Sequence, residues 1–156
     1  MQPALELVGI EKRFGPVHAN RDVNLAVAPG SIHGIVGENG AGKSTLMSIV
    51  YGFYEADSGE IRVGGVPVRI ASSRDSIALG IGMVHQHFML VDTLSVLDNV
   101  MLGAEGGALL GRGAEAIRRR LGELAKSYGL AVDPDALVGD LPVGLQQRVE
   151  IVKALL

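Results

Sequence analysis

Short apolar runs separated by glycine and proline dominate the first half of the chain. Apolar positions within 5–10 predict a first strand, which should break at 12–16. Apolar and polar or small residues alternate over 23–27, as in a half-buried strand, and Pro29-Gly30 ends it. The segment 58–70 predicts two further short strands around a Gly-Gly turn. These patterns indicate a sheet near the N-terminus.

Two other runs are apolar with little alternation. Ser31–Val36 and Ile81–Val84 are each typical of a buried strand. Between them, Leu46–Tyr51 predicts a buried helix ending at Gly52, and 72–79 predicts a short helix.

From about residue 88 the pattern becomes helical. Ser95 and Asp98 have the spacing of a helix start with a capping side chain. A glycine-rich loop is expected over 103–113, and 114–128 places its apolar residues on one helical face. The segment 144–156 predicts a last helix. We therefore expect an α/β fold.

Composition narrows the class of protein. The 156 residues suit one domain, and 47% hydrophobic residues with a net charge of −3 indicate a globular chain. The mild acidity argues against a protein that binds nucleic acid through phosphate contacts alone, so no nucleic-acid partner is expected. Cysteine is absent, which excludes a disulfide framework and a thiolate metal site. The sequence shows no signal peptide and no apolar run suited to a membrane span.

One stretch between the predicted strand 31–36 and the predicted helix 46–51 carries recognisable chemistry. It fits the pattern of Gly, four residues, then Gly-Lys-Ser/Thr, in which backbone N–H groups surround a phosphate. A match by chance, given this chain's many glycines, has a probability of roughly one in a hundred or less. We refer to the stretch as the phosphate loop, Gly37-Glu38-Asn39-Gly40-Ala41-Gly42-Lys43-Ser44-Thr45.

The residue types in the phosphate loop have separate tasks. Glycines let the backbone approach an anion closely, and the positive end of the following helix favours negative charge. The Lys43 ammonium can reach the outer phosphates of a nucleotide, and the Ser44 hydroxyl can bind Mg²⁺. The sequence thus predicts nucleotide phosphate binding.

Three other features allow competing interpretations. Phe14 lies in a turn where its ring could stack on a nucleotide base, although spacing alone favours a loop aromatic at the core edge. His85 and His87 lie two apart but lack an evident third metal ligand, while Gln86 could bind Mg²⁺ or simply end a strand. Asp92 follows four apolar residues and could hold Mg²⁺, or it could end an apolar loop.

Together these segments resemble the ATP-binding subunit of ATP-binding-cassette (ABC) transporters. The phosphate loop matches the Walker A motif of that family, and 12–15 lie where the family has its adenine-stacking aromatic loop. Met83-Val84-His85-Gln86 matches the Q-loop, and 141–148 aligns with the signature motif, usually Leu-Ser-Gly-Gly-Gln followed by Gln-Gln-Arg. Within the family, 85–88 and 141–151 resemble importers of simple sugars and nucleosides.

The resemblance implies roles for individual residues. Phe14 would stack on adenine, the phosphate loop would bind the phosphates of ATP, and Ser44 and Gln86 would contact Mg²⁺. Lys43 and Gln86 would act in catalysis, and Gly144 of the signature would contact ATP held by a second cassette. The implied fold is a P-loop NTPase core over 1–87, with an N-terminal antiparallel β subdomain, and a helical subdomain over 88–156.

The chain departs from the family pattern in two respects. In the signature, Pro142 replaces serine, Val143 the first glycine and Leu145 the glutamine. The Walker B segment with its Mg²⁺ aspartate and catalytic glutamate, which the family carries just beyond the signature helix, is absent. We therefore expect an N-terminal fragment of a nucleotide-binding domain that lacks the C-terminal part of the cassette and is itself inactive in hydrolysis.

The function implied by the resemblance is ATP hydrolysis that drives import of simple sugars or nucleosides. The expected partners are a second cassette and transmembrane permease subunits, which would place the protein at the cytoplasmic face of the membrane. Two alternatives remain. One is a small P-loop kinase or NTPase that uses Asp92 for Mg²⁺, and the other is an ATP-binding module that does not hydrolyse ATP.

Overall fold

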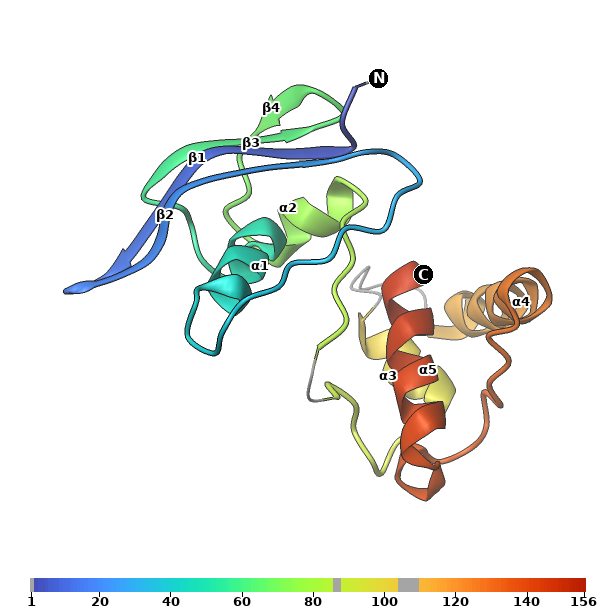
Figure 1. Cartoon of the computed structure of the whole chain (residues 1–156). Helices are drawn as coiled ribbons and strands as arrows, with labels where there is room; N and C mark the ends of the chain where they lie inside the picture. Colours follow the sequence, from blue (N-terminus) through green and yellow to red (C-terminus); the bar gives the residue numbers. More distant parts are fainter. Residues whose placement is uncertain (1, 86–87, 104–109) are drawn as a thin grey trace. The chain divides into compact units, whose positions relative to one another are not determined.

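The chain consists of two compact units, Met1–Gly82 and Met83–Leu156 (Figure 1). The computed structural model describes residues 2–85, 88–103 and 110–156. Side chains are described in the same ranges except at 103 and 110–112. Each unit has buried apolar residues of its own.

The first unit contains an antiparallel sheet in the order β2-β1-β3-β4 (Figure 1). The strands are β1 Leu5–Phe14, β2 Val17–Val27, β3 Ser58–Val63 and β4 Val66–Val68. Gly64 and Gly65 join β3 to β4 with φ of 55° and 75°, as the tight turn of a two-residue hairpin requires.

Two helices complete the first unit. Helix α1, Lys43–Tyr51, follows the phosphate loop and ends at Gly52 in a left-handed conformation. Helix α2, Ser73–Ala78, begins with a capping box formed by Ser72 and Asp75. Both helices lie on the same side of the sheet (Figure 1). The buried cluster joins the sheet to α1 and to the segment after β4; its members are Leu7, Ile10, Leu46, Ile49, Val50, Ile61 and Ile70.

The second unit is helical in its described residues. It contains α3 Val96–Gly103, α4 Leu110–Tyr128, the 3₁₀ turn η1 Val138–Asp140, and α5 Val143–Leu155. Ser95 caps α3 as expected, because the Asp98 N–H donates to the Ser95 hydroxyl oxygen at 3.0 Å. Two apolar clusters hold these elements together. One is Val96, Val138 and Val149, and the other is Leu121, Leu124 and Val152.

The two apolar runs predicted to be buried strands are not strands in the structure. Ser31–Val36 is irregular and exposed, with Ile32 fully accessible and Val36 96% exposed. Ile81–Val84 is also irregular, and Val84 is 42% exposed. Strands of this apolar type need neighbours on both edges and layers on both faces, and neither run pairs with a strand in the described part of the chain. The prediction identified the apolar character and was wrong about the element.

Several boundaries also differ from the predictions. Strand β2 begins at Val17, before the predicted start at 23. Residues 12–14 continue β1 instead of breaking it, because they pair with β2 across a hairpin whose turn is Gly15-Pro16. Helix α4 begins at Leu110, before the predicted start at 114. The remainder of the predicted loop, 104–109, lies outside the described residues. None of the helices in the described ranges is long and apolar enough to cross a membrane.

Candidate functional site

The phosphate loop bends sharply immediately before α1. Gly40 and Gly42 have φ of 84° and 82°, a left-handed conformation that suits glycine. Gly42 occupies the N-cap of α1 and offers no capping side chain, and the first turn of the helix contains no acidic residue. The first N–H groups of α1 therefore keep their positive potential for an anion.

The ammonium of Lys43 folds back over the phosphate loop. It donates hydrogen bonds to the carbonyl oxygens of Gly37 at 2.6 Å and Glu38 at 2.7 Å. The Ala41 N–H donates to the Glu38 carbonyl at 3.2 Å, which closes the turn. Carbonyl oxygens here occupy the donors of a lysine that could otherwise bind phosphate oxygens.

The other loop residues are accessible. Glu38, Asn39 and Ala41 are exposed, as is Ser44 in the first turn of α1, and Thr45 is half-buried. The Ser44 hydroxyl is thus accessible beside the Lys43 cation, and its predicted contact with Mg²⁺ stays a prediction. The described residues contain no group of three or more His, Cys, Asp or Glu side chains that could hold a metal ion by themselves.

Gly42 packs directly against β2. A Cβ at this position would lie 2.1 Å from the Ala19 carbonyl oxygen and 2.9 Å from Asn20 Nδ2. The Asn20 side-chain amide donates to the Gly42 carbonyl oxygen at 3.1 Å, and Asn20 is 5% exposed. Asn20 could not be recognised from the sequence, because in the polar run Asn20-Arg21-Asp22 nothing distinguishes it from a surface residue.

Phe14 ends β1 and remains accessible, with 42% of the residue exposed. Its ring meets Tyr54 edge to face at a centroid distance of 5.2 Å, and the Lys12 ammonium lies 5.5 Å from the ring centre. Asp57 anchors this strand end, since it accepts from Lys12 Nζ at 2.8 Å and from the Arg13 N–H at 2.6 Å. These bonds, first the one from Lys12, lower the pKa of Asp57. Phe14 is thus an exposed ring on a fixed strand end.

The expected Q-loop is only partly visible. Gln86 and His87 lie outside the described residues, so their predicted roles stay predictions. The following segment is anchored to α5. The carboxylate of Glu150, which is 3% exposed, accepts from the Met89 N–H at 2.8 Å, and Lys153 Nζ donates to the Met89 carbonyl at 3.2 Å.

Asp92, the alternative metal ligand, has an exposed side chain. Its backbone carbonyl accepts from the Gly139 N–H at 2.9 Å, which joins the segment before α3 to η1. The structure thus gives the backbone of Asp92 a definite packing role.

The signature segment, residues 141–148, forms the start of α5. Pro142 is the N-cap, and Gly144 in the first turn is exposed, with no atom within 4 Å of where a Cβ would lie. Gln146 Nε2 donates to the carbonyls of Val138 at 3.2 Å and Leu141 at 3.0 Å, which fixes the turn leading into the helix. The helix N-terminus near Gly144 is therefore open to another molecule.

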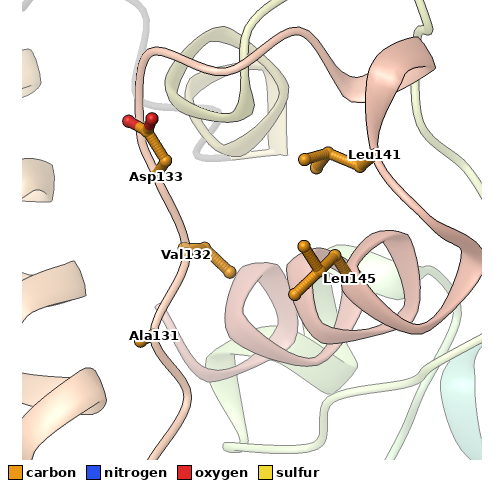
Figure 2. Close-up of a pocket in the computed structure, with 5 residues that line it drawn as sticks. All are labelled: Ala131, Val132, Asp133, Leu141 and Leu145. Atoms are coloured by element: carbon orange, nitrogen blue, oxygen red, sulfur yellow. The ribbon is translucent and has the colours of Figure 1, made fainter.

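A cavity of about 290 Å³ lies beside the signature segment (Figure 2). It is lined by Ala131, Val132, Asp133, Leu141 and Leu145. Figure 2 shows Val132, Leu141 and Leu145 directing their side chains toward it, with Asp133 at the edge. The lining is mainly apolar, and the aligned glutamine of the usual signature is here Leu145. This cavity offers no set of groups for catalysis.

Comparison with known proteins identifies relatives. The model of the ABC transporter family matches residues 20–156. The nucleoside import ATP-binding protein NupA of Lactococcus lactis is 47% identical over 154 residues, which cover 99% of this chain and 30% of the relative. The ribose import ATP-binding protein RbsA 1 of Burkholderia thailandensis is 47% identical over 156 residues, covering 99% of this chain and 31% of the relative.

Solved structures give the same result for the fold. A nucleotide-free ATP-binding cassette from an ABC transporter superimposes with a TM-score of 0.84 at 25% identity, covering 99% of this chain and 65% of that chain. CbiO1 from Clostridium perfringens, part of the ABC transporter complex cbiONQ, gives a TM-score of 0.79 at 27% identity and covers 99% and 62%. The chain spans about 30% of the length of the curated relatives it matches.

Proposed function

The chain belongs to the ABC transporter family, and on this premise we propose that it binds Mg-ATP as part of an ATPase that drives import of simple sugars or nucleosides. The predicted α/β cassette fold and the family were correct. The substrate class is proposed because relatives that match 99% of this chain are named as nucleoside and ribose import ATP-binding proteins.

The observation that carries the proposal is the geometry of the phosphate loop. Left-handed glycines turn the backbone in front of α1, the helix N-terminus has no acidic neighbour in its first turn, and Lys43 lies across the loop. Each feature favours a polyphosphate at the same place.

The roles proposed for individual residues combine this geometry with the family resemblance. Lys43 and the N–H groups of 37–45 hold phosphate oxygens, Ser44 and Gln86 contact Mg²⁺, and Phe14 stacks on adenine. Bound Mg²⁺ would neutralise charge on the phosphates. Lys43 is positioned to exchange the carbonyls of Gly37 and Glu38 for phosphate oxygens. By resemblance to the family, Gln86 would orient water.

The complete importer would need more than this chain. Two cassettes would enclose ATP, with Gly144 at the open N-terminus of α5 facing nucleotide held by the other cassette. Permease subunits would hold the cassettes at the cytoplasmic face of the membrane. This chain contains no Walker B aspartate or catalytic glutamate, so we expect weak ATP binding and negligible hydrolysis by the chain alone.

A titration of the chain with Mg-ATP tests the proposal. Lys43→Ala should weaken binding about tenfold or more, because a charge-assisted bond to phosphate is worth roughly 1.5–3 kcal/mol. Lys126→Ala, which removes an exposed lysine of the same charge from the last turn of α4, should leave affinity unchanged. Calorimetric titration measures both. Absence of ATP binding, or equal affinity of the two variants, would overturn the proposal.

Turnover separates the remaining alternatives. Steady-state hydrolysis by this chain at the rate of a complete cassette, abolished by Lys43→Ala, would contradict the fragment interpretation. A small kinase that uses Asp92 for Mg²⁺ predicts that Asp92→Asn abolishes activity and that Gln86→Ala has little effect, whereas the cassette proposal predicts the reverse in the completed protein. ATP-dependent association without turnover in the longer protein would favour a binding module that does not hydrolyse ATP.

A further inference from the structure

Asn20 is an unusual residue for the inner side of β2. It is 5% exposed, and its side-chain amide donates to the Gly42 carbonyl oxygen at 3.1 Å. Gly42 is the last residue before α1. Its other polar atom, Oδ1, is buried with no hydrogen-bond partner among the described residues. An unpaired buried acceptor costs about 1–3 kcal/mol, a cost that an apolar side chain at this position would avoid.

The cost of the unpaired oxygen indicates that the donor of the same side chain has a task. Among the described residues, its only hydrogen bond reaches the phosphate loop, at the residue whose peptide turns the chain into α1. Gly42 also approaches β2 so closely that a Cβ would lie 2.1 Å from the Ala19 carbonyl oxygen. The close backbone contact and the side-chain hydrogen bond therefore occur at the same place, a junction in which Ala19 and Asn20 of β2 contact Gly42.

The junction connects two parts of the proposed ATP site. Asn20 pairs with Lys12 across the β1–β2 hairpin, and the same hairpin carries Phe14 at the end of β1. On the other side of the junction, the Gly42 carbonyl accepts from the Leu46 N–H at 2.9 Å and so begins α1. The Gly42 bond thus fixes the start of the phosphate-binding helix relative to the hairpin.

We propose that Asn20 is a positioning residue, whose side-chain amide holds the Gly42 peptide so that the phosphate loop keeps the conformation that receives a polyphosphate. The proposal rests on the proposed function of the loop. Asn20 does not touch the nucleotide; it acts through Gly42. A change at Asn20 should therefore alter the affinity for a polyphosphate whether or not the ligand carries adenine.

Asn20→Leu is the main test, because it removes both the donor and the unpaired acceptor. Binding of inorganic tripolyphosphate and of ATP should each weaken by about five- to tenfold, the equivalent of one net hydrogen bond. Thermal unfolding should occur at the same or a higher temperature than in the wild type, since the buried oxygen is gone. Loss of affinity without loss of stability distinguishes positioning from a merely structural role.

Asn24→Leu is the matched control on the same strand. Asn24 is exposed, accepts from the Gly9 N–H at 2.8 Å and donates to the Asp22 carbonyl at 2.9 Å, which keeps its described bonds within the sheet. It should lower the unfolding temperature and leave tripolyphosphate affinity unchanged. Asn20→Asp supplies a second variant, which keeps the size but replaces the amide donor with a charged carboxylate, and it should weaken binding whether or not the leucine variant folds. Because the carboxylate also repels phosphate, the resonances of the ligand-free loop decide whether the loop conformation has changed in this variant.

Amide NMR of the ligand-free chain makes the test independent of nucleotide binding. The Gly40 and Gly42 resonances should move, and their hydrogen exchange should accelerate, in Asn20→Leu or Asn20→Asp but not in Asn24→Leu. If the wild type binds no ATP, the proposed function fails while the resonances still report on Asn20. Unchanged loop resonances and unchanged tripolyphosphate affinity in both Asn20 variants would overturn the inference, as would affinity that falls only with the folded fraction.

Discussion

The phosphate loop of the first unit and the signature segment of the second unit are held by different kinds of contact. Gly42 touches the backbone of β2 where no Cβ could fit, and Asn20 adds one side-chain bond. In the second unit, side chains on helices hold the segments around the signature, with Gln146 binding the carbonyls of Val138 and Leu141.

Side-chain hydrogen bonds also hold the segment that follows the expected Q-loop. Asn99, 1% exposed, accepts from the Val91 N–H at 2.7 Å and donates to the carbonyls of Val91 and Ser95, both at 3.0 Å. Glu150 holds the Met89 N–H in the same way. Contact through backbone alone leaves little tolerance for any side chain, whereas side-chain bonds can be removed one at a time at a smaller cost.

The largest effect is expected for Gly42→Ala. The new Cβ meets the Ala19 carbonyl at 2.1 Å and also disfavours φ of 82°, so the first unit should lose roughly 3 kcal/mol or more of unfolding free energy. Denaturant unfolding and hydrogen exchange of α1 measure the loss. Gly30→Ala is the control, because Gly30 has φ of 69° and open space around it, and only about 1–2 kcal/mol is expected there. Equal losses in the two variants would show that the approach to β2 is unimportant.

A smaller effect is expected for Asn99→Ala in the second unit. The substitution leaves the Val91 peptide groups and the Ser95 carbonyl without their side-chain partner, at a cost of about 2–3 kcal/mol. Hydrogen exchange of 88–100 should accelerate accordingly. Asn24→Ala, at an exposed asparagine that also makes hydrogen bonds, should cost about 1 kcal/mol or less. A cost for Asn99 no greater than for Asn24 would remove the distinction between the two units.

The smallest effect concerns pH at the start of α2. The Ser72 hydroxyl, followed by the Ala71 N–H, lowers the pKa of Asp75 from its ordinary value. A lowered folded-state pKa gives stability that is present above the ordinary pKa of aspartate, about 3.9, and is lost as the pH falls through the folded-state pKa. Hydrogen exchange of Ile77–Leu79 should therefore accelerate relative to the rest of the unit below about pH 4.

Asp75→Asn removes the titrating group and should abolish this pH dependence. Asp98→Asn changes the corresponding position after Ser95 in the second unit and should leave the pH profile of α2 unaltered. A profile that persists in Asp75→Asn would assign the pH dependence to another group.

Several elements could be predicted because their causes are local. The Gly64-Gly65 turn permits positive φ at adjacent residues, and the Ser95–Asp98 pair satisfies the start of α3 from three residues away. The alternation at 23–27 likewise identified part of β2. The predicted helix 46–51 lies within α1, which begins slightly earlier, at Lys43.

Other features depend on residues distant in the sequence. Ser31–Val36 has the composition of a buried strand but does not form one, because a strand needs edges to pair with and composition does not supply them. Within the first unit, folding brings Asn20 to Gly42 across 22 positions of sequence. Within the second unit, it brings Glu150 to Met89 across 61 positions.

The sequence alone determined the chemistry available to this protein, a glycine-rich loop ending in Lys43 and Ser44 at the start of a helix, because local backbone preferences and residue types suffice for that. The tertiary structure decided how firmly each segment is held. Close backbone packing at Gly42 and buried side-chain bonds from Asn20, Asn99 and Glu150 arise only where distant segments meet away from water, where polar groups must find partners within the protein.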